Sequence, residues 1–237
     1  MLCQYCGKSI DDDSRFCKYC GGIQGDASLS NVGFEIENGE LKRYHGSAPD
    51  VTVPSSVNTI GKNAFKDNKA LISMELPDTV TLIKAGAFQN CTALISIQLG
   101  SQLAAIQEWA FTNCTSLNTC KLPDSLSTLG PCAFYGAGLT NITLPRRITQ
   151  IPANCFMECH QLQEVHLPDS IRLIGASAFA HSGLCSILIP QGVTRIAEEC
   201  FLSAGICWSF NSLKLFRTLS LPPFAAVACA PCASHRV

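Results

Sequence analysis

The sequence predicts a stacked-repeat solenoid with a small, separate module at its N-terminus. Two observations support this prediction. An Ala-Phe or Cys-Phe pair returns seven times at intervals of 22 or 23 residues, and the first 22 residues contain two closely spaced cysteine pairs. A fixed period of this length is typical of proteins in which each repeat forms one coil and packs on the next. The phenylalanines of the repeated pair are Phe65, Phe88, Phe111, Phe134, Phe156, Phe179 and Phe201.

The composition is that of a chain with a large apolar core. Of the 237 residues, 47% are hydrophobic and 15% are charged, and the net charge is -1. This charge gives no general attraction to nucleic acid or anionic lipid. No apolar segment reaches the roughly 18 residues that span a bilayer, and the N-terminus does not resemble a secretory signal. With an odd number of cysteines, 15, we expect reduced thiols and a cytoplasmic location.

The first element, residues 1–22, is expected to hold a structural zinc ion. Cys3 and Cys6 form one Cys-x2-Cys pair and Cys17 and Cys20 form a second. Each pair can bind one edge of a tetrahedral Zn²⁺ through two thiolates. A segment this short cannot fold on a hydrophobic core, so metal binding would supply the folding energy. Two disulfides or an iron–sulfur centre are the alternatives. The segment resembles the short zinc-ribbon modules at the N-termini of many bacterial proteins.

The charges of this segment do not favour nucleic-acid binding. Lys8, Arg15 and Lys18 are balanced by three consecutive aspartates at 11–13. A ribbon that binds nucleic acid normally has a basic face. We therefore favour a structural or protein-docking role, with a nucleic-acid-associated regulator as the alternative.

Two short segments precede the repeats. Residues 23–32 contain Gly, Ser, Asp and Asn and are expected to be a flexible linker. Residues 33–53 contain Asn38-Gly39 between two apolar segments, which is a hairpin signal. A solenoid needs a cap over its first open face, and we expect this hairpin to be that cap.

Residues 54–206 divide into coils that share one pattern. A turn residue, in most coils proline, opens the coil, and aliphatic residues follow three and six positions later. The phenylalanine comes five residues after the second aliphatic, and a Leu-x-x-Ile-x-Leu strand such as Leu94, Ile97 and Leu99 closes the coil. A single coil cannot bury enough apolar surface to fold alone, so the fold depends on stacking.

Two positions vary with coil length. Long coils have a cysteine at one equivalent position, Cys91, Cys114 or Cys159, which we expect to be a small buried hydrophobic residue. Coils one residue shorter have a glycine before the strand aliphatic, because a tighter turn needs backbone angles that glycine can adopt. These glycines are Gly138, Gly183 and Gly205.

The repeats resemble the BspA-type leucine-rich repeat family, whose unit is close to LPxSVTxIGxxAFxxCxxLxxIxL. Residues 76–99 and 167–190 match this unit nearly throughout, and the resemblance covers roughly residues 34–206. It implies a curved, right-handed solenoid with parallel β-strands on one face and short helical or 3-10 turns. Family members are often secreted or surface proteins that bind host or partner proteins, so a surface adhesin is a further candidate function.

Period-two alternation places a row of side chains on the outer face of the strands. The row is polar and mixed in sign, and we expect it to bind a protein partner, with an ordinary solvated surface as the alternative. The residues expected to bind are Ser73, Glu75, Ser96, Gln98, Thr119, Lys121, Asn141, Thr143, Glu164 and His166. The same alternation extends the row to Ser186 and Leu188.

No arrangement in the sequence predicts catalysis. Cys159 and His160 are adjacent, and adjacent side chains usually point in different directions. Cys229 and Cys232 form a Cys-x2-Cys pair without the strand-to-helix context of a redox motif. The sequence therefore predicts a non-enzymatic scaffold for protein–protein interaction.

The repeat phase is lost after Phe201. Ser209 and Asn211 stand where the next strand requires aliphatic residues. We expect residues 207–237 not to continue the fold, and a reading-frame shift in the gene is our hypothesis for their origin. Translation of the other frames of the encoding DNA tests it.

Overall fold

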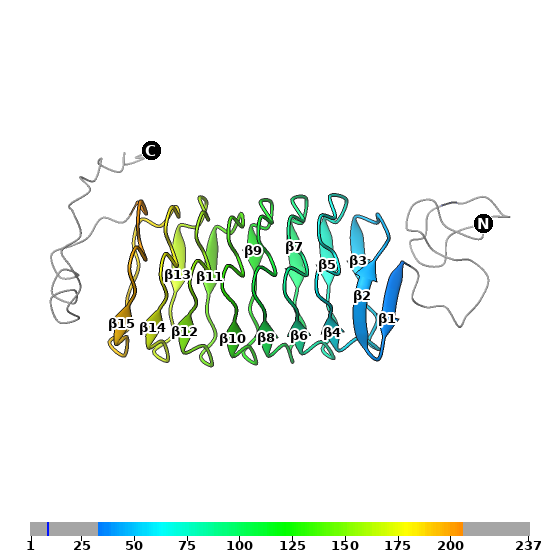
Figure 1. The fold of residues 1–237 in the computed structure, drawn as a ribbon, viewed down its shortest axis with the longest axis horizontal. Helices are drawn as coiled ribbons and strands as arrows, with labels where there is room; N and C mark the ends of the chain where they lie inside the picture. Colours follow the sequence, from blue (N-terminus) through cyan, green and yellow to red (C-terminus); the bar gives the residue numbers. More distant parts are fainter. Residues whose placement is uncertain (1–8, 10–32, 206–237) are drawn as a thin grey trace.

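A computed structural model describes Ser9 and residues 33–205 of the chain. Within 33–205 the chain winds through successive coils that lie side by side in sequence order (Figure 1). The four zinc-ribbon cysteines, the linker at 23–32 and the tail at 207–237 lie outside the described residues. Predictions about those segments remain predictions.

Each coil contributes short parallel strands on two sides of the stack (Figure 1). We call the first side the binding row; its ladders are β3-β5-β7-β9 and β11-β13. Its strands are β3 (Asp50–Thr52), β5 (Ser73–Glu75), β7 (Ser96–Gln98), β9 (Thr119–Cys120), β11 (Asn141–Thr143) and β13 (Glu164–His166). Equivalent residues of successive coils pair, as Met74 does with Ile97.

The second side, which we call the rear row, was not expected, because the resemblance implied a sheet on one face. Its ladders are β1-β2-β4-β6-β8-β10 and β12-β14-β15. Its strands are β1 (Phe34–Glu37), β2 (Glu40–Tyr44), β4 (Thr59–Ile60), β6 (Leu82–Ile83), β8 (Ala105–Ile106), β10 (Thr128–Leu129), β12 (Gln150–Ile151), β14 (Leu173–Ile174) and β15 (Arg195–Ile196). From β4 onwards each strand has two residues, which is too short for a period-two pattern to be recognised.

Turns connect the two rows, and no helix occurs among the described residues. The turns have hydrogen bonds between residues three apart, such as Cys91 N–H to Phe88 O at 3.1 Å. Backbone φ is positive two residues before and two residues after each repeat phenylalanine, as at Trp109 (60°) and Asn113 (57°). Left-handed residues at this spacing interrupt any helical run. The parallel solenoid is thus confirmed, with turns in place of helices.

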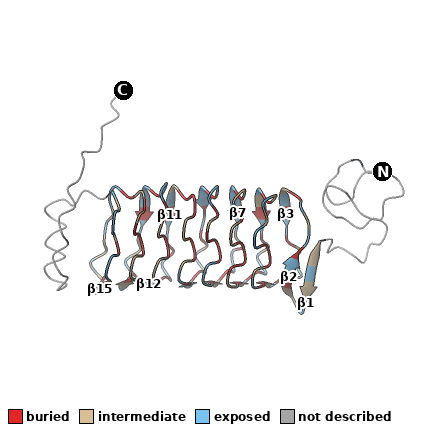
Figure 2. Ribbon diagram, turned by 45° about the horizontal axis from the view of Figure 1, so that its top comes forward, coloured by how far each residue is buried: buried red, intermediate tan, exposed pale blue. Residues whose placement is uncertain are grey.

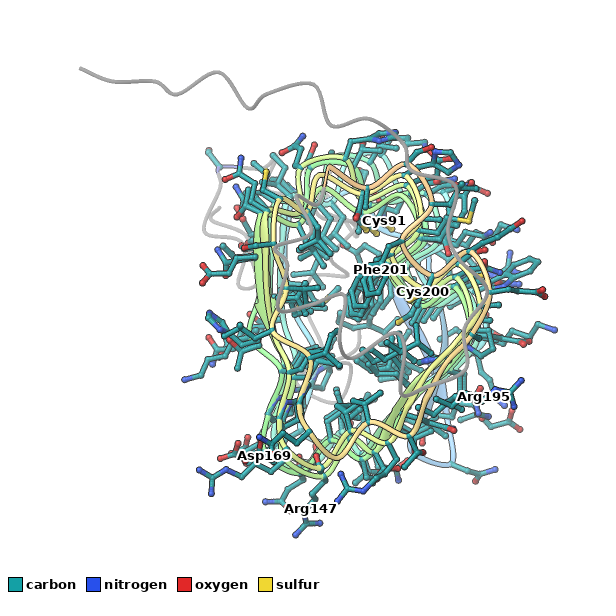
Figure 3. The ribbon with its side chains drawn as sticks, turned by 90° about the vertical axis from the view of Figure 1, so that its left-hand side faces the viewer. Cys91, Arg147, Asp169, Arg195, Cys200 and Phe201 are labelled. Carbon is teal, nitrogen blue, oxygen red and sulfur yellow. The ribbon has the colours of Figure 1, made fainter. Side chains whose placement is uncertain are left out.

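A ladder of stacked phenylalanine rings forms the centre of the core. Neighbouring rings from Phe65 to Phe201 have centroids 5.0 to 5.7 Å apart and interplanar angles of 3° to 11°. Viewed along the stack, Phe201 and Cys200 point into the interior, whereas Arg147 and Asp169 point outward from a turn (Figure 3). The regular spacing of the pair along the chain therefore reflects one aromatic column.

The N-terminal hairpin extends this aromatic column. Asn38 and Gly39 both have positive φ, 51° and 77°, as a tight two-residue hairpin turn requires. The Tyr44 ring lies 5.2 Å from that of Phe65 and 5.1 Å from that of Phe34. The predicted hairpin is thus confirmed, and its aromatic side chains cover the first phenylalanine.

Two of the three glycines of the shorter coils, Gly138 and Gly183, are needed for a different reason from the one expected. Neither Gly138 nor Gly183 has a positive φ. A Cβ atom at Gly138 would instead collide with the carbonyl oxygen of Thr115, and one at Gly183 with that of His160. The chain passes so close to the preceding coil that only glycine fits.

Candidate partner-binding face

The outer side of the binding row presents the predicted polar side chains. The central residue of each strand is buried, for example Ile97, Ile142 and Val165. Exposed residues flank these positions, and Figure 2 shows them along β3, β7 and β11. Of the ten predicted binding residues, Ser73 is half-buried and the other nine are exposed. The alternation therefore identified the outward positions correctly.

The row ends one strand earlier than predicted. Ser186 and Leu188 are exposed, and Leu188 reaches 89% exposure, but their segment forms no strand. The coil before this segment is one residue shorter, and Gly183 N–H bonds to Cys159 O at 3.1 Å. The ladder also breaks between β9 and β11, where the first short coil lies. Removal of one residue from a coil thus disturbs strand pairing in this row.

The row also begins one strand earlier than predicted. Asp50 and Thr52 of β3 are exposed and pair in register with Ser73 and Glu75. The hydroxyl of Ser73 donates to Asp50 Oδ1 at 2.5 Å. A sequence signal for this strand was present, because residues 51–54 repeat the aliphatic-x-aliphatic-Pro ending of later coils. We include Asp50 in the face because of this register.

Two shallow grooves lie along the face, and their charges differ in sign. The first, of about 360 Å³, crosses β3, β5 and β7; its charged lining residues are Asp50 and Glu75. The second, of about 590 Å³, crosses β9, β11 and β13; its lining contains Lys121, Arg146 and His166, with Asp124 as its acidic residue. The first groove is therefore acidic, whereas the second is lined by two permanent cations and one acid. Glu164 of β13 lies on the same face as the second groove and contacts His166.

Arg146 was missed because it lies in a turn and not in a strand. It follows the proline that closes β11, at a position where other coils have aspartates such as Asp78 and Asp169. Asp78 has a structural contact there: its carboxylate accepts a hydrogen bond from Ser101 N–H at 2.7 Å, which lowers the pKa of Asp78. The replacement of such an aspartate by Arg146 was visible in the sequence.

The histidines of the face and its surroundings form local pairs. His166 Nε2 lies 3.2 Å from Glu164 Oε1, so two of the predicted binding residues contact each other. His160 Nε2 lies 3.0 Å from Glu158 Oε2. Cys159, beside His160 in the sequence, points inward instead, and the structure does not bring the two together.

The repeated cysteines are buried, as expected, and they also link neighbouring coils. The thiols of Cys91, Cys114 and Cys159 donate to carbonyl oxygens of the preceding coil at 3.0 to 3.1 Å, in each case that of a repeat phenylalanine. Burial raises the pKa of Cys91 and Cys159 to about 12. These thiols are therefore protonated near neutral pH and unsuited to nucleophilic chemistry.

In the part of the chain that the structure describes, no group of three or more His, Cys, Asp or Glu side chains could hold a metal ion. No helix in this part is long and apolar enough to cross a membrane.

Comparison with known proteins identifies both parts of the chain. Residues 36–157 and 83–207 match the BspA type leucine rich repeat region, in six copies, and residues 2–22 match a zinc-ribbon domain. A comparison with curated proteins finds no match.

The solved structures that resemble this chain are bacterial leucine-rich repeat proteins. A leucine rich cell surface protein from Faecalibacterium prausnitzii A2-165 is 33% identical, with a TM-score of 0.64 over 72% of this chain and 51% of that one. The T. pallidum leucine rich repeat protein is 22% identical, with a TM-score of 0.57 over 77% of this chain and 88% of that one. This chain thus spans about half the length of the F. prausnitzii protein. Because the repeat model matches most of its residues, the chain belongs to the BspA-type leucine-rich repeat family.

Proposed function

We propose that this chain is a non-enzymatic scaffold that binds a protein partner through the outer side of the binding row. The main support is the set of exposed polar side chains at equivalent positions of six stacked strands. The aromatic column behind these strands fixes their positions before a partner arrives. A preorganised surface loses little conformational entropy on binding.

The test is to block the face without changing its charge. Ser96→Tyr with Thr143→Tyr places two large side chains on β7 and β11, and tyrosine is well tolerated in strands. The matched control is Thr128→Tyr with Gln150→Tyr on β10 and β12 of the rear row, where both residues are also exposed. Ligands are first selected from a peptide display library on the immobilised full chain.

We expect the binding-row variant to lose affinity for the selected ligands by at least about tenfold, because the strands are no longer accessible. The rear-row variant should bind as the wild type does. Equal binding by all three proteins, or loss of binding in the rear-row variant alone, would contradict the proposed function.

A surface adhesin is the second candidate function. It is favoured by the likeness to the F. prausnitzii cell surface protein. The cytoplasmic location expected from the sequence is the competing proposal. Antibody labelling of intact cells distinguishes them: labelling without permeabilisation supports the adhesin, and labelling only after permeabilisation supports the cytoplasmic scaffold.

We also propose that residues 1–22 hold a structural Zn²⁺. The support is the zinc-ribbon match together with the donor set, since the four thiolates of two Cys-x2-Cys pairs suit tetrahedral zinc. Cys3, Cys6, Cys17 and Cys20 would hold the ion, which would stabilise the fold of this segment. A nucleic-acid role for the ribbon is the alternative, and DNA binding that weakens as salt rises would support it.

A further inference from the structure

The charge of the binding row changes sign along the stack, and this pattern specifies a kind of ligand. We propose that the face binds an extended peptide segment of its partner, with a basic residue over β3–β7 and an acidic residue over β9–β13. This inference rests on the proposed function and adds to it the chemistry of the ligand.

The acidic end has carboxylates that are available to a ligand. Asp50 and Glu75 are exposed, and neither forms an ion pair with another described residue. The hydroxyl of Ser73 occupies one acceptor position of Asp50 and leaves the other oxygen open. The groove that these residues line contains no cationic side chain. A lysine or arginine of a ligand would therefore find two uncompensated acids there.

The basic end has cations that are equally available. Lys121 and Arg146 are exposed and form no ion pair with another described residue. They line one groove with His166 and one acid, Asp124. A second acid on β13, Glu164, contacts His166 and neither of the two cations. An arginine guanidinium can bind both oxygens of one carboxylate, which gives geometric selectivity for aspartate or glutamate.

The separation of the two ends sets the spacing of charges in the ligand. Three coils separate β5 from β11, and neighbouring strands lie about 4.8 Å apart, so the ends are about 14 Å apart. This exceeds the screening length of about 8 Å in physiological salt, so the ends do not neutralise each other. An extended peptide advances about 3.3 Å per residue. The expected ligand thus has a basic and an acidic residue about four positions apart.

A second copy of the chain is the competing occupant. A face that is acidic at one end and basic at the other is complementary to itself after a two-fold rotation. Each strand of the binding row has only two or three residues, so the face is a narrow band across the stack. A band of this kind suits a single extended peptide better than the broad surface of a stable dimer, which buries roughly 800 Å² per partner.

The test reverses each end of the face separately and then both together, in the full-length protein. Asp50→Lys with Glu75→Lys reverses the acidic end, and Lys121→Glu with Arg146→Glu reverses the basic end. Glu108→Lys with Arg195→Glu is the control, because both residues are exposed but lie outside the two grooves. The milder variants Asp50→Asn and Glu75→Gln serve if a reversal prevents folding, as checked by circular dichroism. Ligands come from a display library of random octapeptides.

We expect peptides selected on the wild type to have basic and acidic residues about four positions apart. Reversal of either end should weaken their binding about tenfold, at up to about 1 kcal/mol for each lost ion pair. Reversal of both ends should restore binding, because the same peptide can bind after turning end for end. The control should bind as the wild type does.

Three results would overturn the inference, and they differ in what they imply for the proposed function. Selected peptides that lose binding with Ser96→Tyr and Thr143→Tyr but not with the charge reversals would leave the face as the binding surface and remove the bipolar ligand. Peptides unaffected by either set would remove both proposals. Salt-sensitive dimerisation of the chain that either reversal abolishes would identify a second copy as the occupant.

Discussion

At the scale of single residues, the repeat phenylalanine has the most demanding position. Phe111 is fully buried, and its ring stacks at 5.1 Å on Phe88 and at 5.2 Å on Phe134. Neighbouring coils therefore depend on the same side chain. This explains why the aromatic residue recurs in every coil while the polar positions vary.

Truncation of an aromatic side chain should reduce stability more in the middle of the column than at its end. We expect Phe111→Ala to lower the free energy of unfolding by about 3 to 5 kcal/mol, as for other buried aromatics. Phe34→Ala should cost less, because Phe34 is half-buried and its ring packs against that of Tyr44 at the end of the column. Urea denaturation of both variants measures the difference. Equal losses of unfolding free energy would contradict a column in which each central ring stabilises two neighbouring coils.

The buried thiols predict how stability depends on alkaline pH. Burial raises the pKa of Cys91 from 9.0 to about 12, so the folded state favours the protonated thiol. This contribution is fully present below pH 9 and is lost as the pH rises towards 12. We expect the urea midpoint to fall over this range, and to fall less in Cys91→Ala. Cys185→Ala, at an exposed cysteine, is the control and should leave the pH dependence of the urea midpoint unchanged.

At the scale of elements, the N-terminal hairpin is joined to the coils by an ion pair as well as by the aromatic column. The Glu40 carboxylate of β2 lies 2.8 Å from Nζ of Lys84 in the coils and 2.9 Å from Nζ of Lys42 in its own strand. Strand β2 pairs in parallel with β4, the first strand of the repeats in this row. The hairpin thus continues the rear row, and its strand β1 is the terminal strand of that ladder.

These contacts predict that the stability of the folded state depends on pH in the acidic range. The hydrogen bonds from Lys84 and then Lys42 lower the pKa of Glu40 below 4.5. A lowered pKa stabilises the folded state above about pH 4.5, and this stabilisation is lost as the pH falls through the lowered value. Glu40→Gln should therefore be less stable than the wild type at pH 6, and the difference should be smaller at pH 3. Thermal melts at both pH values test this, and a constant difference would contradict it.

The N-terminal ribbon, also an element, predicts a metal content. Metal analysis of the purified full chain should find one zinc ion per chain, because the four thiolates would together form a single tetrahedral site under the structural-zinc proposal. Cys3→Ser with Cys17→Ser should remove it, whereas Cys114→Ser should not. The absence of zinc from the wild type, or iron in its place, would disprove the structural-zinc proposal.

Much of this architecture could be predicted because each coil repeats the same pattern. The repeat phase predicted the strands of the binding row, and Asn38-Gly39 predicted the hairpin turn. The two-residue strands of the rear row were beyond prediction, since no alternation can be seen in so few residues. The left-handed backbone at Trp109 was equally hidden, because it is imposed by the coil against the preference of the residue.

The positions of the candidate site residues could be predicted from the sequence, but the distribution of charge along the face could not. Alternation identified outward side chains such as Glu75 and Lys121. The sign change became visible only with Asp50 and Arg146, which lie in a cap segment and in a turn. Which residues line one groove depends on how neighbouring coils align, and a break at a shorter coil alters that alignment. The sequence pattern of one coil contains no such information.

At the scale of the whole molecule, the stack converts a short sequence pattern into a long row of exposed side chains. Each coil contacts its neighbours only, so stability and surface both grow by addition of coils. The binding row has two grooves of opposite charge, whereas the column of phenylalanines behind it is uniform. Variation is thus confined to the surface, where it can select a partner without altering the core.

Site-specific photo-crosslinking tests the central claim, that the binding row contacts the partner, most directly. Benzoylphenylalanine is placed in the full chain at positions 98 and 143 of the binding row, or at positions 128 and 150 of the rear row. All four wild-type residues are exposed, so each variant presents the probe to solvent. With a ligand selected on the wild-type chain, we expect crosslinks from positions 98 and 143 and none from 128 or 150. Crosslinks from the rear row alone would contradict the central claim.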